Sequence, residues 1–391
     1  NNVDHAGLTI HSTPISKSNP ERQIKNVPAI KRAVMLNRVM QKRKYQIAIS
    51  GMHGKTTTSS LLTHIFTEAD YDPTALLGGI LQNSQTNIRY GQGEYCIVEA
   101  DEYDRSFMEL YPSHGIITNI EPEHMDIYES LEDIKNTFTD FAIRIVQKHS
   151  VILCKDDENI SSILPDIPYY ISYGINQECD YQALQCSYQP GHSTFQLRIY
   201  GKKAGKVRLA LPGQHNILNS LACIAMAREC GIELDVIFKA LDNYQGSRRR
   251  MEIKYEDEKY ILIDDYAHHP TEIQVTLQAL KKAYDRTVLA VFQPHLYSRT
   301  RSFYKDFAGV LKLADQAIVT DIYPAREKPI PGVSSRLITN LDDNIKYCDK
   351  ENLLDMILDV MEPGQIIITL GAGDINMIHT KLINSISKYN N

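Results

Sequence analysis

A lysine flanked by glycines and threonines is the part of the sequence whose residue types most directly indicate chemistry. Glycines allow backbone N–H groups to close around phosphate oxygens, and the dipole of a following helix adds positive potential there. Lys55 can reach the terminal phosphates of a nucleotide, and a hydroxyl from Thr56 or Thr57 can ligate Mg²⁺. The candidate phosphate-binding residues are Gly51, Met52, His53, Gly54, Lys55, Thr56 and Thr57.

The flanking residues support a phosphate loop, although its glycine spacing is unusual. Residues 45–49 are apolar and β-prone, and apolar residues recur at helical spacing over 61–66. The general pattern places a glycine five residues before its Gly-Lys pair, where Ile49 stands, whereas Gly51 is only three residues before Gly54. An ordinary turn is the alternative interpretation of this stretch.

Acidic side chains follow a second apolar run, which ends at Glu99. Residues 99–104 contain four carboxylates, and His124 follows a third apolar run at 115–119. Because the carboxyl ends of parallel strands face the ligand crevice, Glu99 and Asn119 are expected beside the phosphate loop. Hard oxygen ligands suit Mg²⁺, so the sequence predicts a magnesium site there. A solvated acidic turn and a structural histidine are the alternatives.

Four segments in the second half of the chain also carry groups that could bind a ligand. The three arginines of 246–250 could clamp a polyphosphate, for which the guanidinium fork is well shaped, or could form a solvated basic hinge. Residues 264–270, 293–301 and 371–374 each follow an expected strand, where a crevice would lie. A simple turn is the alternative for each of them.

Composition limits the class of protein. The chain has 391 residues, of which 43% are hydrophobic and 23% charged, as in ordinary globular proteins. A net charge of -6 gives no support to binding of nucleic acid or of anionic membranes. The seven cysteines lack Cys-x-x-Cys spacing, which predicts reduced thiols in a cytoplasm. No apolar run approaches the ~18 residues of a membrane span.

The order of the expected elements predicts an α/β protein. From residue 45, strands alternate with helices, as in a mostly parallel sheet covered on both faces. Between 180 and 212 the apolar period changes to two, which predicts antiparallel strands. A second alternation begins near 250, so we expect domains at 1–44, 45–245 and 246–391. Residues 1–44 are too few to fold alone, and the chain opens with Asn1, so we expect a fragment.

Taken in order, these segments resemble the Mur ligases of peptidoglycan synthesis over nearly all of residues 8–387. The matching motifs lie at residues 51–57, 99–102, 118–124, 215–219, 249–250, 265–272 and 293–295. The family's phosphate loop is a short form with three residues between Gly51 and Lys55, which accounts for the unusual spacing.

The resemblance implies a fold and a reaction. The implied fold has a central P-loop-type domain with a mostly parallel sheet for ATP and a C-terminal Rossmann-like α/β domain for the amino acid. Residues 1–44 would be a remnant of an N-terminal Rossmann-like domain for the UDP-sugar. The implied reaction, in the bacterial cytoplasm, uses ATP to phosphorylate the lactyl carboxylate of UDP-N-acetylmuramate. The amine of L-alanine then attacks the acyl phosphate, which gives an amide, ADP and phosphate.

The resemblance also implies roles for single residues. Lys55 and Mg²⁺ would stabilise charge on the transferring phosphoryl group. Thr56 and Glu99 would hold one Mg²⁺, and His124 the second. The residues that would position the nucleotide are His215 and Asn219 at adenine, Asp265 at the ribose and Arg250 at the phosphates. His268 and Arg299 would face the incoming alanine.

Two positions depart from the family pattern. Other Mur ligases carry a carbamylated lysine where Thr139 stands, so no modified lysine is expected. Leu296 stands where related sequences often carry arginine.

Residues 1–44 contain no Gly-x-Gly turn after a strand, and therefore no backbone cradle for the UDP pyrophosphate. We expect this chain to bind Mg·ATP but to bind UDP-N-acetylmuramate weakly and to form little product.

Two other functions remain open at this point. A ligase that recycles a murein tripeptide onto UDP-N-acetylmuramate would share the ATP motifs, although the loop at 321–332 looks more like that of the alanine ligase. A nucleotide-dependent switch or binding module without ligase activity is the alternative from another class.

Overall fold

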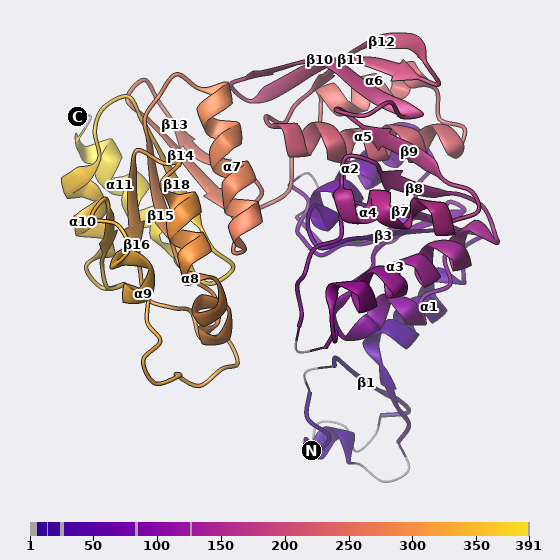
Figure 1. The fold of residues 1–391 in the computed structure, drawn as a ribbon, viewed down its shortest axis with the longest axis horizontal. Helices are drawn as coiled ribbons and strands as arrows, with labels where there is room; N and C mark the ends of the chain where they lie inside the picture. Colours follow the sequence, from indigo (N-terminus) through magenta and orange to yellow (C-terminus); the bar gives the residue numbers. More distant parts are fainter. Residues whose placement is uncertain (1–5, 14, 24–26, 83–84, 126, 390–391) are drawn as a thin grey trace. The chain divides into compact units, whose positions relative to one another are not determined.

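The computed structural model describes residues 6–13, 15–23, 27–82, 85–125 and 127–389. The chain divides into two units (Figure 1). The first unit contains residues 1–186, 194–209 and 216–245, and the second contains residues 187–193, 210–215 and 246–391. The division into domains at 1–44, 45–245 and 246–391 stays a prediction.

A ten-stranded sheet, which lies mainly in the first unit, has the order β12-β11-β10-β9-β8-β7-β3-β6-β4-β5. Its strands are β3 (Tyr45–Ser50), β4 (Thr74–Leu76), β5 (Ile88–Arg89), β6 (Tyr95–Glu99), β7 (His114–Ile117), β8 (Val151–Cys154), β9 (Ile171–Gly174), β10 (Tyr181–Gln189), β11 (His192–Ile199) and β12 (Lys202–Leu209). The pairs from β10 to β4 are parallel, and β5 is antiparallel to β4. Connections of two residues join β10 to β11 and β11 to β12, which requires antiparallel neighbours.

The central strands are buried, so they read as continuous apolar runs. Ile47, Ala48 and Ile49 of β3 have no exposed surface. A strand covered on both faces needs apolar side chains in both directions, which explains this pattern. The helices of the first unit are α1 (Arg32–Met40), α2 (Lys55–Glu68), α3 (Leu131–Val146), α4 (Glu158–Ile163), α6 (Leu234–Asp242) and α5 (Gln214–Glu229). The first two residues of α5 group with the second unit.

The second unit contains a six-stranded sheet of order β13-β14-β18-β15-β16-β17. Its strands are β13 (Glu252–Glu256), β14 (Tyr260–Asp265), β15 (Val288–Phe292), β16 (Gln316–Val319), β17 (Ile345–Tyr347) and β18 (Gln365–Leu370). All pairs are parallel except β13 with β14. Its helices are α7 (Pro270–Ala283), α8 (Tyr297–Leu311), α9 (Arg336–Thr339), α10 (Leu353–Val360) and α11 (His379–Tyr389).

Helices cover both faces of this second sheet (Figure 1). One core contains Ile261 and Ile263 of β14 with residues of α7 and α8, and the other contains Leu262 of β14 with residues of α10 and α11. Successive side chains of a strand point to opposite faces, so one strand supplies both cores. The predicted α/β class, with a mostly parallel sheet followed by a Rossmann-like sheet, is confirmed.

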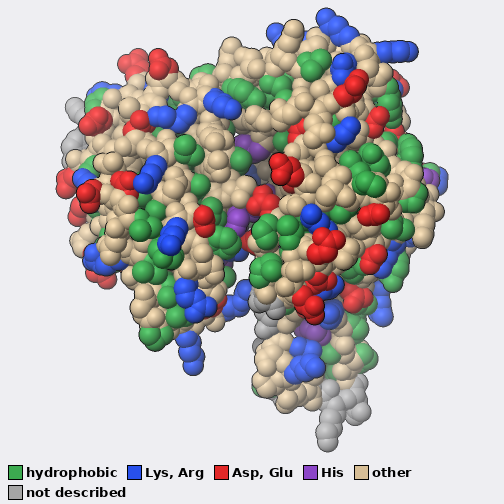
Figure 2. All heavy atoms as spheres, viewed as in Figure 1, with side chains coloured by type: hydrophobic (Ala, Val, Ile, Leu, Met, Phe, Trp, Pro, Cys, Tyr) green, Lys and Arg blue, Asp and Glu red, His purple; other side chains and the backbone are tan. Residues whose placement is uncertain are grey.

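The N-terminal residues, the surface and the length of the helices add three observations. β1 (Thr9–His11) and β2 (Ala29–Lys31) form a parallel pair that precedes α1. On the face drawn in Figure 2, basic and acidic side chains are intermixed and do not form a large field of one sign. Among the described residues, no helix is both long enough and apolar enough to cross a membrane.

Candidate active site

The phosphate loop lies between the end of β3 and the start of α2, and its two glycines have little space around them. Gly51 has φ 130° and Gly54 has φ 82°, and a residue with a side chain would be strained at either value. A Cβ atom on Gly51 would lie 2.1 Å from Oγ1 of Thr118, and one on Gly54 would lie 2.7 Å from Oδ1 of Asn219. The loop conformation therefore requires glycine at both positions. Asn219, predicted to position adenine, is the neighbour of Gly54.

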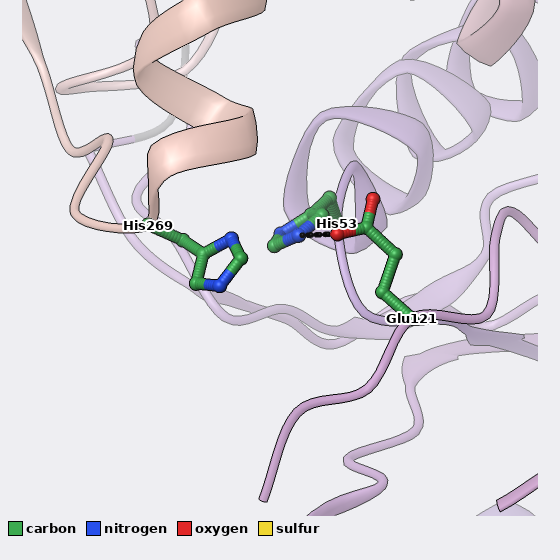
Figure 3. A group of neighbouring side chains, drawn as sticks. All are labelled: His53, Glu121 and His269. Atoms are coloured by element: carbon green, nitrogen blue, oxygen red, sulfur yellow. Dashed lines mark ion pairs between the residues drawn. The ribbon is translucent and has the colours of Figure 1, made fainter. Parts of the chain in front are cut away.

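Residues that follow β7 hold the loop in place. The backbone N–H of His53 donates to Oδ1 of Asn119 (2.8 Å), and Nδ2 of Asn119 donates to the carbonyl oxygen of His53 (3.0 Å). The hydroxyl of Thr118 donates to the same carbonyl oxygen (2.6 Å). The side chain of His53 pairs with Glu121 at 3.4 Å (Figure 3). The loop is therefore fastened to the neighbouring strand end at residues 118–121. Asn119 was expected beside the loop, but none of these residues was assigned a catalytic or ligand-binding role.

Lys55, the first residue of α2, lies back over the loop. Its Nζ donates to the carbonyl oxygens of Gly51 (2.6 Å) and Met52 (3.1 Å), and it pairs with Oε2 of Glu102 at 2.7 Å. Burial lowers the pKa of Lys55, but the charges of Glu102 and Glu99 outweigh it, so the pKa is raised. Lys55 is therefore a fixed positive charge at the start of a helix, as a phosphate site requires.

Glu102 is a site residue that the prediction did not single out. Its side chain is only 3% exposed, and its second oxygen lies 3.3 Å from Nε2 of His124. The hydroxyl of Tyr128 donates to its backbone carbonyl oxygen at 2.7 Å. Burial raises the pKa of Glu102, but Lys55 and His124 more than offset this effect, so the pKa is lowered. Glu102 thus links Lys55 to His124.

Glu99 contacts the other side of the α2 terminus. The hydroxyl of Thr56 donates to Oε1 of Glu99 (3.2 Å), the hydroxyl of Ser59 donates to Oε2 (3.4 Å), and the backbone N–H of Gly78 donates to Oε2 (2.9 Å). These donors fix the carboxylate beside the Thr56 hydroxyl. Of the two threonines considered, Thr56 is therefore the one that contacts Glu99, while Thr57 is the next residue of α2.

In the second unit, the charge of Arg250 acts on both His215 and Asp265. Burial and the charge of Arg250 lower the pKa of His215 to about 4, so its ring is neutral at pH 7. Arg250 lies over the ring of Tyr266, 5.2 Å from its centroid. Both oxygens of Asp265 accept backbone N–H groups, from Met251 and from Ala267, each at 2.8 Å. Burial raises the pKa of Asp265 to about 6, against the opposing charge of Arg250.

His268 and Arg299 meet at His295, a motif residue that was not among the predicted site residues. The rings of His268 and His295 lie 5.7 Å apart, and Nη1 of Arg299 donates to Nδ1 of His295 at 3.4 Å. Burial, with the charge of Arg299, lowers the pKa of His295 to about 4. The neutral ring can therefore accept the hydrogen bond from Arg299 at its Nδ1. The ring of Tyr323 stacks on His295 at 5.9 Å. Leu296, with φ 70°, turns the chain into α8.

The predicted site residues therefore form two groups, one within each unit. The group in the first unit is Gly51, Met52, His53, Gly54, Lys55, Thr56, Thr57, Glu99, His124 and Asn219. The group in the second unit is His215, Arg250, Asp265, His268 and Arg299. An anion site with carboxylates, followed by an arginine and histidine site, suits transfer of a phosphoryl group and then reaction of a second substrate.

Two family models and many named proteins match the chain. Residues 49–227 match the Mur ligase middle domain, and residues 249–373 match the Mur ligase glutamate ligase domain. UDP-N-acetylmuramate–L-alanine ligase of Syntrophotalea carbinolica is 39% identical over 96% of this chain and 84% of its own length. The same-named protein of Syntrophus aciditrophicus is 38% identical over 99% of this chain and 82% of its own length.

Solved structures agree with these matches. UDP-N-acetylmuramate-alanine ligase MurC of Thermotoga maritima superposes with a TM-score of 0.83 at 26% identity, over 98% of this chain and 86% of that one. A murein peptide ligase of Psychrobacter arcticus shares the fold, with a TM-score of 0.69 at 22% identity over 97% and 85% of the two chains. The chain belongs to the Mur ligase family.

Proposed function

We propose that this protein is an ATP-dependent ligase that joins L-alanine to the lactyl carboxylate of UDP-N-acetylmuramate, a step of peptidoglycan precursor synthesis in the bacterial cytoplasm. The observation that carries this proposal is the position of Lys55, held over a glycine loop at the start of a helix with Glu102 beside it. Relatives at 37–39% identity bear the name of this alanine ligase, which supports the choice of substrates.

The first half of the reaction is assigned to the phosphate loop. ATP transfers its terminal phosphoryl group to the lactyl carboxylate, which gives an acyl phosphate and ADP. Lys55 and the N–H groups at the start of α2 stabilise the charge that develops on the transferring group, which is mainly electrostatic work. Asn219 and the neutral ring of His215 position adenine, Asp265 the ribose, and Arg250 the phosphates.

The second half of the reaction is assigned to residues 246–391. The amine of alanine attacks the acyl carbon, the C–N bond forms as the C–O bond to phosphate breaks, and the amine loses a proton as phosphate leaves. The guanidinium of Arg299 is shaped for the carboxylate of the amino acid. Both Arg299 and His268 lie beside the ring of His295. Residues 1–44 would belong to the part of the protein that binds the UDP-sugar.

The residues around Thr56 fit a magnesium ion. A hydroxyl and a carboxylate oxygen lie 3.2 Å apart there, and Mg²⁺ prefers such hard oxygen ligands. Thr56 and Glu99 would hold one ion, and His124 is assigned to the second. When bound, Mg²⁺ neutralises charge on the phosphates.

The proposed function is tested directly by an acceptor assay, which compares the amines that the protein can ligate to UDP-N-acetylmuramate. The full-length protein is incubated with ATP and UDP-N-acetylmuramate, and ADP and ligated product are measured with L-alanine, with other amino acids, and with a murein tripeptide. ADP release should require both UDP-N-acetylmuramate and L-alanine. Faster turnover with the tripeptide would identify a recycling ligase. A steady rate of ATP hydrolysis that does not depend on UDP-N-acetylmuramate or on L-alanine would identify a nucleotide-dependent module without ligase activity.

Replacing Glu99 with glutamine should raise the Mg²⁺ concentration needed for half-maximal activity by about tenfold or more. The amide keeps the shape of the side chain but removes the negative charge beside the hydroxyl of Thr56. Activity is measured across a Mg²⁺ titration at saturating ATP. Glu94→Gln is the matched control, because Glu94 lies at the surface and pairs with Lys44. A Glu99→Gln curve that overlays the parent curve would contradict the metal assignment.

A further inference from the structure

A chain of polar side chains is buried in the second unit, beside the proposed phosphate-binding arginine. Asp264 is 1% exposed, Thr369 is fully buried, and His379 is 5% exposed. The hydroxyl of Thr369 donates to Oδ1 of Asp264 at 3.0 Å and lies 2.7 Å from Nε2 of His379. Since a hydroxyl has one hydrogen, which goes to Asp264, His379 donates to Thr369. The chain of bonds therefore runs from His379 through Thr369 to Asp264.

Arg249 closes this chain on the other side of Asp264. Its Nε donates to Oδ2 of Asp264 at 3.2 Å. Its other two nitrogens donate to the carbonyl oxygens of Gly371 (2.5 Å) and Gly373 (2.9 Å). Only the fixed fork of a guanidinium can reach three acceptors in this way. Arg249 thus joins the end of β14 to the glycine loop that follows β18.

In the sequence, Arg250 lies between Arg249 and Met251, and each of these two residues donates a hydrogen bond to a buried aspartate. Asp264 holds the side chain of Arg249, and Asp265 accepts the backbone N–H of Met251 at 2.8 Å. Arg249 and Met251 have φ of 58° and 50°, a left-handed conformation that is unfavourable for side-chain-bearing residues. The surrounding bonds must therefore impose the path of the backbone on both sides of Arg250.

A buried ion pair is weak evidence for stability, because the cost of removing the charges from water offsets their attraction. The attested contribution of such a pair is to fix one geometry among several. The group whose geometry is fixed here is the backbone that carries Arg250, whose own side chain lies over Tyr266.

We propose that Asp264, with Arg249, Thr369 and His379, positions Arg250 for its contact with the ATP phosphates. This inference rests on the proposed function, in which Arg250 binds phosphate. The four residues act through Arg250 and do not touch the nucleotide themselves, so they are positioning residues. Their loss should weaken ATP binding only as long as Arg250 is present.

A double-mutant cycle on the full chain tests this dependence. The dissociation constant of Mg·ATP is measured by calorimetry for Arg249→Lys and Thr369→Val, each alone and combined with Arg250→Ala. Lysine keeps the charge of Arg249 but loses the fork, and valine keeps the shape of Thr369 but loses the hydroxyl. Each single change should raise the dissociation constant by about tenfold with Arg250 present, and by less than about twofold in the Arg250→Ala protein.

Matched variants separate positioning from damage to the fold. Thr320→Val removes a buried hydroxyl with no hydrogen-bond partner in the described part of the chain, and should leave ATP binding unchanged. Thr369→Ser keeps the hydroxyl and should bind ATP like the parent. If Thr369→Val does not fold, Arg249→Lys carries the test, because it removes the three-way bonding of the guanidinium.

Equal weakening in both backgrounds would overturn the positioning role, and so would parent-like binding by both Arg249→Lys and Thr369→Val. If Arg250→Ala itself binds ATP like the parent, the phosphate role of Arg250 is wrong and this inference falls with it. The acceptor assay would still decide the ligase function independently.

Discussion

Replacing Lys55 with alanine is expected to lower the rate of ligation by about 10²–10³ and to leave the fold intact. The lost ammonium group would have stabilised charge on the transferring phosphoryl group, so the loss should appear mainly in kcat. The fold should persist, because Glu102 keeps its contact with His124 and can take up a proton. Product formation and the thermal unfolding midpoint are measured on the same preparation.

Lys44→Ala is the control for this change. Lys44 is an exposed lysine that pairs with Glu94 at 3.3 Å, and its removal should leave the rate within about twofold, since surface ion pairs contribute little. A Lys55→Ala protein that retains activity within a few-fold of the parent would show that the glycine loop is an ordinary turn.

The change of Glu102 to glutamine should lower kcat by about 10² and also lower the unfolding temperature. The amide cannot neutralise Lys55, which would then be held in a buried site with its closest counter-charge missing. The same change removes the negative charge beside His124, so two proposed catalytic groups are affected together. Because displacement of a reacting group by about 1 Å can cost 10²-fold, the effect on rate should be large.

Asp101→Asn provides the comparison, because Asp101 is the preceding carboxylate and its side chain is 48% exposed. It should retain most of its activity and its unfolding temperature. Equal losses in Asp101→Asn and Glu102→Gln would mean that the acidic cluster acts only through its total charge, and would contradict a specific role for Glu102.

The phosphate loop and both sheets could be predicted because short-range patterns encode them. A buried parallel strand needs an apolar run, and β3, β6, β15 and β18 all read that way. Shorter elements were not predicted, such as β4 with three residues and β5 with two, because so few residues carry no periodicity.

The importance of Glu102 could not be predicted, because four carboxylates occur within six residues of sequence. Their directions depend on the backbone, and Asp104, the last of the four, adopts a φ of 54°, with Arg105 after it at 53°. Arg105 then pairs with Asp133 at 2.6 Å, which anchors this turn to a distant helix. Only such long-range contacts distinguish the buried Glu102, which meets Lys55, from its half-exposed neighbour Asp101.

The same limit applies to the division between units. Residues 187–193 and 210–215 group with the second unit, although the alternating pattern of 180–212 continues through the first of these segments. A period of two shows which faces a strand presents but not what packs against them. The sequence pattern therefore could not show that two short segments group with the second unit, and the domain boundary at 245/246 stays a prediction.

The hold of Thr118 and Asn119 on the phosphate loop has a kinetic consequence. Because residues 51–54 are fastened to the adjacent strand end, their conformational freedom is lost when the chain folds and not when the nucleotide arrives. A ligand that meets a rigid receptor does not have to wait for a rare open or closed form. At this loop the encounter between nucleotide and protein should follow a single exponential, with an observed rate that rises linearly with nucleotide concentration.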